Sequence, residues 1–202
     1  MSLWLADQPL VLASKSESRR ATLENAGIPI DIHPADIDER AVEARAKAND
    51  PGSVAALLAR EKARTIAARM PGRLVLGADQ TLTLGARRFS KPNDAAAARK
   101  QLRALKGQTH ELHSALALVR DGAIAFEHLE VARLTMREFS DRFLDTYLAA
   151  AGAMVTASVG AYQVEKLGIQ LFDRIDGDHF TILGLPLLAL LDRLRREGLL
   201  AT

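Results

Sequence analysis

A short apolar segment that runs directly into a polar, basic one limits the possible folds of this chain most strongly. Residues 10–13 have the length of a strand, residues 14–17 are polar, and a helix with two arginines in its first turn is predicted from Ser18. Free backbone N–H groups and the positive end of the helix dipole would point into the loop between them. The stretch LVLASKSESRR at residues 10–20 therefore predicts a strand, loop and helix that bind an anion.

The side chains of this stretch suit a phosphate group. Ser14, Ser16 and Ser18 supply hydroxyl donors, and Arg19 and Arg20 supply planar guanidinium groups that match phosphate oxygens. The alternative is that the two arginines only cover the solvated face of an ordinary first helix. The stretch is not a P-loop, because the pattern G-x-x-x-x-G-K-S/T is absent.

Composition narrows the class of protein. With 202 residues, 48% of them hydrophobic, the chain can bury one sizeable core as one domain or two small lobes. A formal charge of only +2 argues against a broad nucleic-acid-binding surface and a stable nucleic-acid partner. The absence of cysteine excludes disulfides, thiolate zinc sites and a cysteine nucleophile. Without a membrane-length apolar run or a signal-peptide pattern, we expect a soluble, cytoplasmic protein with no membrane partner.

Hydrophobic periodicity predicts alternating strands and helices along the rest of the chain. Strands are expected around residues 30–37, 74–76, 109–120 and 123–136, and helices over residues 18–26, 53–70, 94–106, 140–150 and 186–196. Ser53, Asn93 or Asp94, and Ser140 are the expected N-caps. Asp121-Gly122 is a hairpin signal between the two long strands, whereas residues 40–52 show no clear pattern.

Asp79 directly follows the apolar strand at residues 74–76. An acid just past the carboxyl end of a strand lies where open α/β sheets bind their ligands, although an ordinary turn residue is the alternative. Lys62 lies on a long helix, where most lysines face solvent, and Lys91 lies beside the rigid Pro92. His110 and His113, the only histidines at close spacing, are expected on opposite faces of a strand and so predict no metal site.

Seven motifs, in one order along nearly the whole chain, resemble the Maf family of nucleoside triphosphate pyrophosphatases. They are Ala13-Ser14-x-Ser16-x-x-Arg19-Arg20, Asp38-Glu39, Glu61-Lys62-Ala63, Gly77-Ala78-Asp79-Gln80, Ser90-Lys91-Pro92, Gly160 to Glu165, and Gly184-Leu185-Pro186. The resemblance implies an α/β fold with a mixed, partly parallel sheet flanked by helices, similar to inosine triphosphatases. It also implies a single domain over residues 1–202, with two lobes around a deep cleft.

The resemblance further implies hydrolysis of a nucleoside triphosphate to the monophosphate and pyrophosphate, with a divalent metal and often in a homodimer. In this chain Asp79 would accept the proton, and Glu39, with Asp38 nearby, would hold Mg²⁺ or Mn²⁺, since such hard ions prefer carboxylate and phosphate oxygens. The expected phosphate-binding residues are Ser14, Ser16, Arg19, Arg20, Lys62 and Lys91.

Three positions bear on the choice of base. Gln80 and Glu165 resemble the family branch that acts on 7-methyl-GTP, and a carboxylate can accept from the paired N–H edge of guanine. Ser18 departs from that branch, which often has tryptophan there. We therefore expect 7-methyl-GTP as substrate, with dTTP, UTP or modified pyrimidine nucleotides as the alternative. A nucleotide-binding regulator of cell division without important catalysis is an alternative of another class, but such a protein would not need Asp79.

Overall fold

The computed structural model describes residues 2–46 and 50–202 of the chain. Contacts between residues divide the chain into two compact units. The first unit comprises the residues up to Gln80 together with Ser114–Glu130 and His179–Thr202, and the second comprises Thr81–His113 and Val131–Asp178. The predicted single domain with two lobes around a cleft stays a prediction.

The strands form a mixed sheet of seven strands in the order β2-β1-β3-β5-β6-β7, with β4 paired to β3. They are β1 (Leu10–Leu12), β2 (Ile30–Ile32), β3 (Val75–Leu84), β4 (Arg87–Phe89), β5 (Thr109–Arg120), β6 (Ala123–Met136) and β7 (Phe172–Asp176). β1 pairs in parallel with β2 and β3, whereas β4 and β7 are antiparallel to their neighbours. The predicted mixed, partly parallel sheet is thus confirmed.

The helices are α1 (Glu17–Asn25), α2 (Glu39–Ala46), α3 (Pro51–Ala67), α4 (Ala95–Leu105), α5 (Asp141–Ala151), α6 (His179–Ile182) and α7 (Leu187–Arg196), with 3-10 turns at Gly152–Thr156, Val159–Ala161 and Leu167–Leu171. The five predicted helices begin and end close to the expected positions, whereas α2 and α6 were not predicted. Asp94 and Ser140 are N-caps, as predicted. Among the described helices, none combines the length and apolar character that crossing a bilayer requires.

The predicted cap of α3 was wrong. The helix begins two residues before Ser53, and the Asp50 carboxylate accepts a hydrogen bond of 2.7 Å from the Ser53 backbone N–H. Asp50 is the N-cap because Pro51 follows it, and proline is favoured at the first position of a helix. The polar stretch at residues 40–52 contains most of α2, and its residues 47–49 lie outside the described residues.

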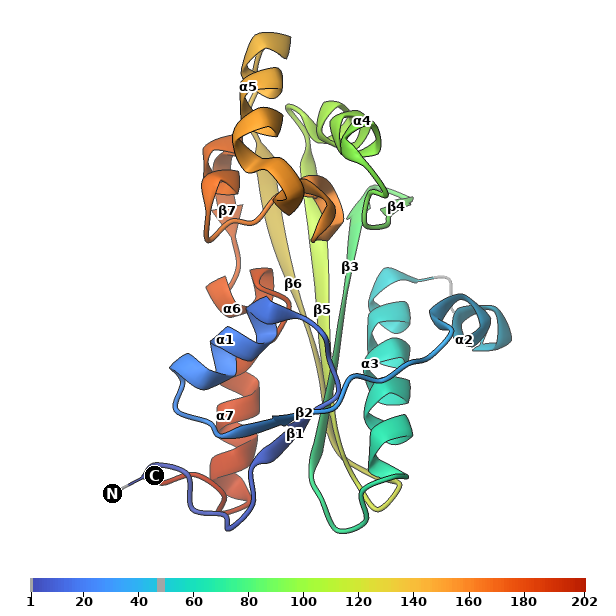
Figure 1. Cartoon of the computed structure of the whole chain (residues 1–202), viewed down its shortest axis with the longest axis vertical. Helices are drawn as coiled ribbons and strands as arrows, with labels where there is room; N and C mark the ends of the chain where they lie inside the picture. Colours follow the sequence, from blue (N-terminus) through green and yellow to red (C-terminus); the bar gives the residue numbers. More distant parts are fainter. Residues whose placement is uncertain (1, 47–49) are drawn as a thin grey trace. The chain divides into compact units, whose positions relative to one another are not determined.

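In the first unit, successive side chains of the sheet enter two different cores. Leu76 and Leu118 pack with α1 and α7 on one face, whereas Val75 and Ala117 pack against the alanine-rich side of α3 on the other. Figure 1 shows α3 along one side of these strands and α7 along the other. Gly77 belongs to the α3 face, where an added Cβ would lie only 2.0 Å from the Ala59 carbonyl oxygen. Odd-numbered residues of β3 in this unit therefore face α3.

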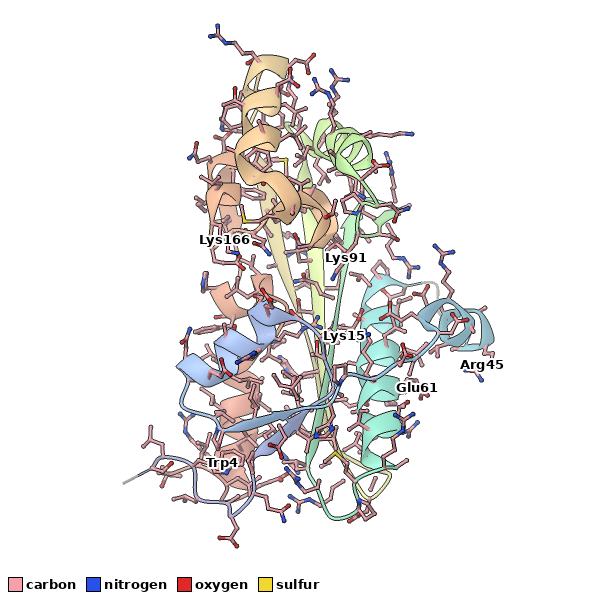
Figure 2. All side chains as sticks on the ribbon, viewed as in Figure 1. Trp4, Lys15, Arg45, Glu61, Lys91 and Lys166 are labelled. Atoms are coloured by element: carbon pink, nitrogen blue, oxygen red, sulfur yellow. The ribbon has the colours of Figure 1, made fainter. Side chains whose placement is uncertain are left out.

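The ends of the described chain close the core of the first unit. The Leu5 N–H donates to the Leu199 carbonyl at 3.0 Å, and Trp4 forms a β-bridge with Leu200. Figure 2 shows Trp4 at the end of the unit where α7 ends. The Trp4 indole N–H donates to the Gln8 carbonyl at 3.1 Å, so the buried ring leaves no unpaired donor.

In the second unit, two ion pairs join α4 to α5, and a third joins residues just outside the two helices. Arg99 pairs with Asp145, Arg103 with Asp141 at 3.0 Å, and Lys106 with Glu138 at 3.2 Å. The numbers rise along α4 while they fall along α5, so the two helices run antiparallel. Beneath them, the buried His110 ring forms a hydrogen bond of 2.7 Å with the Tyr162 hydroxyl.

Candidate active site

The predicted strand, loop and helix at the start of the chain are confirmed. β1 ends at Leu12, and α1 begins at Glu17, one residue earlier than predicted, with Ser16 as its N-cap. The Ser16 Oγ accepts from the Arg19 backbone N–H at 3.4 Å, and the Ser14 Oγ accepts from the Ser16 N–H at 3.2 Å. A hydroxyl that accepts a hydrogen bond can still donate its own hydrogen, so both serines remain able to donate to a phosphate.

The two arginines of α1 point in different directions. Arg19 is buried, and its guanidinium donates to the Gly184 carbonyl at 2.8 Å and to the Ser14 Oγ at 3.3 Å. Arg20 instead lies on the surface, where it forms an ion pair of 2.8 Å with Glu24. Arg19 is therefore held in one orientation, whereas a contact between Arg20 and phosphate would require Arg20 to exchange its partner.

Asp79 lies inside a strand, so the prediction that it follows the end of a strand was wrong. β3 runs on to Leu84 because residues 81–84 alternate threonine and leucine, which suit a strand, and pair with β4. The neighbouring strand β1 is the one that ends: its last residue, Leu12, pairs with Leu76. Asp79 thus lies on β3 beyond the carboxyl end of β1, the strand that leads into the Ser14–Ser16 loop.

Lys62 joins two carboxylates. Its ammonium nitrogen lies 2.6 Å from Asp79 Oδ1 and 2.6 Å from Glu39 Oε1. Burial raises the pKa of Asp79 above the ordinary value for a carboxyl group, while the positive charges of Lys62 and Arg19 oppose this rise. Glu39 is the first residue of α2, and the preceding Asp38 fixes that end of the helix by accepting from the Ala41 N–H at 3.0 Å.

Arg19 belongs to the same electrostatic cluster. Burial lowers the pKa of its guanidinium, and the negative charges of Asp79 and Glu39 oppose this effect. With Lys62, the four groups carry two positive and two negative charges, so the cluster is neutral when all are ionised. An incoming triphosphate would bring several negative charges that this cluster alone does not balance.

The carboxylates suit a hard cation only in part. Within residues 2–46 and 50–202, no three His, Asp or Glu side chains are placed to hold a metal ion together. Glu39 and Asp79 nevertheless converge from α2 and β3 on one cation, the Lys62 ammonium. Two carboxylates fit Mg²⁺, which commonly completes its shell with phosphate oxygens and water. The predicted metal stays a prediction.

Gln80 and Ser18, the predicted specificity residues of the first unit, bind backbone carbonyls. The Gln80 amide nitrogen lies 2.8 Å from the Ser114 Oγ and 3.1 Å from each of the carbonyl oxygens of Thr181 and Ile182. The Ser18 hydroxyl donates to the Leu183 carbonyl at 3.3 Å. Ser114 was missed by sequence analysis, although a serine within the apolar alternation of β5 was a usable signal.

Two predicted site residues belong to the second unit. Lys91 lies in the segment between β4 and α4 (Figure 2), and Glu165 is exposed between the 3-10 turns Val159–Ala161 and Leu167–Leu171. The other predicted residues, Ser14, Ser16, Ser18, Arg19, Arg20, Glu39, Lys62, Asp79 and Gln80, belong to the first unit. The roles of Lys91 and Glu165 stay predictions.

Comparison with known proteins identifies the family. A family model described as "Maf-like protein" matches residues 9–197 of the chain. The chain belongs to the Maf family. The family resemblance inferred from the seven motifs is therefore confirmed. In this Maf protein, the matched region contains every residue of the cluster described above.

Relatives of this Maf protein carry the names of hydrolases. A "Nucleoside triphosphate pyrophosphatase" of Rhodopseudomonas palustris is 58% identical over 201 residues, which cover 100% of both chains. A protein of the same name from Bradyrhizobium diazoefficiens is 56% identical over 201 residues, again 100% of both. A "7-methyl-GTP pyrophosphatase" of Rhizobium etli is 53% identical over 192 residues, which cover 94% of this chain and 96% of the relative. The predicted enzyme class agrees with these names.

Solved structures resemble this Maf protein more distantly. A HAM1 protein from Coxiella burnetii has a TM-score of 0.43 at 20% identity, covering 63% of this chain and 72% of that chain. A dITP/XTP pyrophosphatase from Mycobacterium abscessus has a TM-score of 0.44 at 15% identity, covering 95% and 96%.

Proposed function

We propose that this Maf protein hydrolyses a nucleoside triphosphate to the nucleoside monophosphate and pyrophosphate, through attack of water on the α-phosphorus. The observation that carries the proposal is the cluster of Asp79, Lys62 and Arg19 beside the N-terminus of α1. It combines a proton acceptor with two cations and a set of backbone N–H donors, which are the groups that phosphoryl chemistry requires. The names of the relatives support the same enzyme class.

Asp79 serves as the proton acceptor in this proposal. A buried carboxylate with a raised pKa is a better base than an exposed one, because the pKa lies nearer to the pH at which the enzyme works. Lys62, at 2.6 Å, opposes this rise because its positive charge favours the ionised carboxylate. The pair therefore combines a raised pKa with a cation that favours the proton-accepting form.

Arg19, Lys62 and the start of α1 stabilise the negative charge of the phosphates. Arg19 is fixed by Gly184 and Ser14, so its guanidinium needs little reorganisation when a phosphate arrives. Ser14 and Ser16 add hydroxyl donors at the same helix end, where the dipole also favours an anion. The family resemblance adds Lys91 as a further phosphate-binding cation.

We assign Glu39 as the residue that would hold a divalent cation, Mg²⁺ or Mn²⁺. The Glu39 carboxylate already contacts a positive charge, the Lys62 ammonium, and hard cations prefer such oxygens. When bound, the metal ion would neutralise charge on the phosphate oxygens of the substrate. The neutral balance of the four-group cluster is a further reason to expect a need for added positive charge.

The proposed preferred substrate is 7-methyl-GTP. The Rhizobium etli relative that is named for this nucleotide supports the proposal, as do Gln80 and Glu165, which match that branch by resemblance. The alternative is the same reaction on dTTP, UTP or modified pyrimidine nucleotides. A homodimer and a cytoplasmic location are part of the proposal, but the chemistry does not depend on them.

The test is release of pyrophosphate by the purified protein with Mg²⁺ or Mn²⁺ and a panel of 7-methyl-GTP, GTP, UTP, dTTP and CTP. The Asp79→Asn variant, purified in the same way, excludes a contaminating activity. Preferential cleavage of 7-methyl-GTP is expected, and a preference for pyrimidine nucleotides would overturn the substrate but not the reaction. Nucleotide binding without hydrolysis of any member would instead support a regulatory protein.

Glu165 can be tested with the same panel. Replacing Glu165 with glutamine should reduce the preference for 7-methyl-GTP over GTP, because a neutral amide favours the positive charge of the methylated base less than a carboxylate does. Lys166→Gln, at the next exposed position of the loop, is the matched control and should keep the preference. An unchanged preference in Glu165→Gln would contradict the role of Glu165.

A further inference from the structure

Consecutive backbone carbonyls at the end of α6 are held by side chains from other elements. Gln80 donates to the carbonyls of Thr181 and Ile182 at 3.1 Å each. Ser18 donates to the Leu183 carbonyl at 3.3 Å, and Arg19 donates to the Gly184 carbonyl at 2.8 Å. We call this group the 181–184 carbonyls. Gln80 of β3 binds the first two of them, and Ser18 and Arg19 of α1 bind the last two.

These carbonyls lie at the end of α6. The last carbonyls of a helix lack the usual partner within the helix, and a buried carbonyl without a hydrogen bond is costly. The Thr181 carbonyl also accepts from the Gly184 backbone N–H at 3.0 Å and from the buried Ser114 hydroxyl at 2.7 Å. The Gln80 amide nitrogen in turn lies 2.8 Å from the Ser114 Oγ, so Gln80 and Ser114 form one connected anchor for the segment.

Gly184 connects the anchored segment to Arg19, because its carbonyl accepts the hydrogen bond from the Arg19 guanidinium. Its φ of +90° lies in the region that favours glycine, and an added Cβ would lie 3.3 Å from Arg19 Nη2 and 3.7 Å from Gln80 Cδ. The position that a Cβ of residue 184 would occupy is therefore bordered by both the arginine head group and the glutamine amide. A shift of the 181–184 carbonyls would move the acceptor that orients Arg19.

Gln80 itself faces away from Asp79. The two are neighbours in β3, and successive side chains of a strand point to opposite faces of the sheet. Asp79 contacts Lys62 of α3, whereas Gln80 contacts Ser114 and the end of α6. Both hydrogens of the Gln80 amide can be used by these acceptors, which leaves no N–H to read a base directly.

We infer that Gln80, together with Ser114, is a positioning residue that acts through the 181–184 carbonyls to orient Arg19 toward the substrate phosphates. The inference rests on the proposed function and deepens it. It gives Gln80 a role in phosphate binding beside the base preference for which the family resemblance singles it out. Removal of the amide should therefore lower turnover for every nucleotide that the enzyme accepts.

The test begins with Gln80→Met, which keeps the length of the side chain and removes both amide donors. We expect kcat/KM to fall about tenfold to a hundredfold, because a displacement of a positioned group by about 1 Å has effects of this size. Thr146→Val is the control, since it also removes a side-chain-to-carbonyl hydrogen bond, of 2.9 Å to Arg142, and should leave kcat/KM unchanged.

A double-mutant cycle with Arg19→Met identifies the route of the effect. If Gln80 acts through Arg19, then Gln80→Met should cost less than about threefold when Arg19 is already absent. Additive losses in the cycle would overturn the inference. Ser114→Ala, a smaller change, should repeat the pattern of Gln80→Met at lower amplitude, and thermal unfolding of each variant excludes a loss of folding.

Binding of inorganic pyrophosphate, measured by calorimetry, separates this inference from the proposed function. Gln80→Met should weaken pyrophosphate binding in the presence of Arg19 and leave it unchanged in Arg19→Met. If the wild-type protein hydrolyses no nucleotide, the proposed function fails, but this binding cycle still decides whether Gln80 positions Arg19. Equal weakening in both backgrounds would overturn the inference.

Discussion

Replacement of Lys62 by methionine would test the electrostatics of the cluster. The side chains of Lys62 and Asp79 are only 13% and 12% exposed, so their attraction is little reduced by solvent. Removing one partner of a buried ion pair typically costs about 3–5 kcal/mol, because the other charge is left without compensation. The Lys62–Glu39 pair adds little to this loss of stability, since the Glu39 side chain is 49% exposed. We therefore expect Lys62→Met to lower the free energy of unfolding by about 3 kcal/mol near neutral pH.

The loss should vanish when Asp79 is replaced as well. In Asp79→Asn the buried carboxylate is gone, so a further Lys62→Met change should cost less than about 1 kcal/mol. The coupling free energy from denaturant unfolding of the wild type, both single variants and the double variant measures this directly. Arg60→Met is the matched control on α3, because the Arg60–Glu127 pair is about one-third exposed on each side and should contribute less than about 1 kcal/mol.

The activity of Lys62→Met should report the same interaction. Loss of the neighbouring cation raises the pKa of Asp79 further, so the acidic limb of the kcat/KM profile should move to higher pH, while Arg60→Met leaves the limb in place. An acidic limb that does not move, together with additive free energies in the cycle, would refute the account of Asp79 as a base whose charged form Lys62 favours.

Asp79→Asn should lower kcat by about a hundredfold to ten-thousandfold while nucleotide binding is kept, and near-normal turnover would rule out Asp79 as the base. Stability should fall by up to about 3 kcal/mol as the pH drops from about 6.5 to about 4, because burial lowers the pKa of folded His110 to about 4 while the unfolded chain takes up the proton near 6.5. His110→Gln should remove this dependence and the exposed His33→Gln should keep it, as unfolding at several pH values would show. Gly77→Ala should destabilise the protein by about 2 kcal/mol in denaturant unfolding, because its Cβ would collide with the Ala59 carbonyl; unchanged stability would contradict the close packing of β3 on α3.

Much of the fold could be predicted because its signals are local. The Asp121-Gly122 turn was visible from two residues, and both adopt the positive φ values, 49° and 78°, that this kind of hairpin uses. By contrast, α2 was missed because only Val42 of its residues is buried, so no apolar period marks the helix. β7 was missed because it has five residues between glycine-rich turns and is defined by its pairing with β6.

In the candidate site too, the features with local sequence signals could be predicted and those that depend on distant residues could not. The loop before α1 and its Ser16 cap follow from adjacent residues, and the motifs singled out Lys62, Asp79 and Glu39. The partners of Gln80 could not be predicted, because the Thr181 and Ile182 carbonyls are about a hundred positions away in the chain and backbone carbonyls carry no sequence signal. The different directions of Arg19 and Arg20 depend in the same way on the distant Gly184.

The most direct test of the central claim is to locate the bond that is broken. The purified protein is incubated with Mg²⁺ and its best nucleotide in water labelled with oxygen-18, and both products are analysed by mass spectrometry. Attack on the α-phosphorus predicts that the label enters the nucleoside monophosphate and that the pyrophosphate stays unlabelled. Label in the pyrophosphate, or release of orthophosphate and a nucleoside diphosphate, would contradict the account.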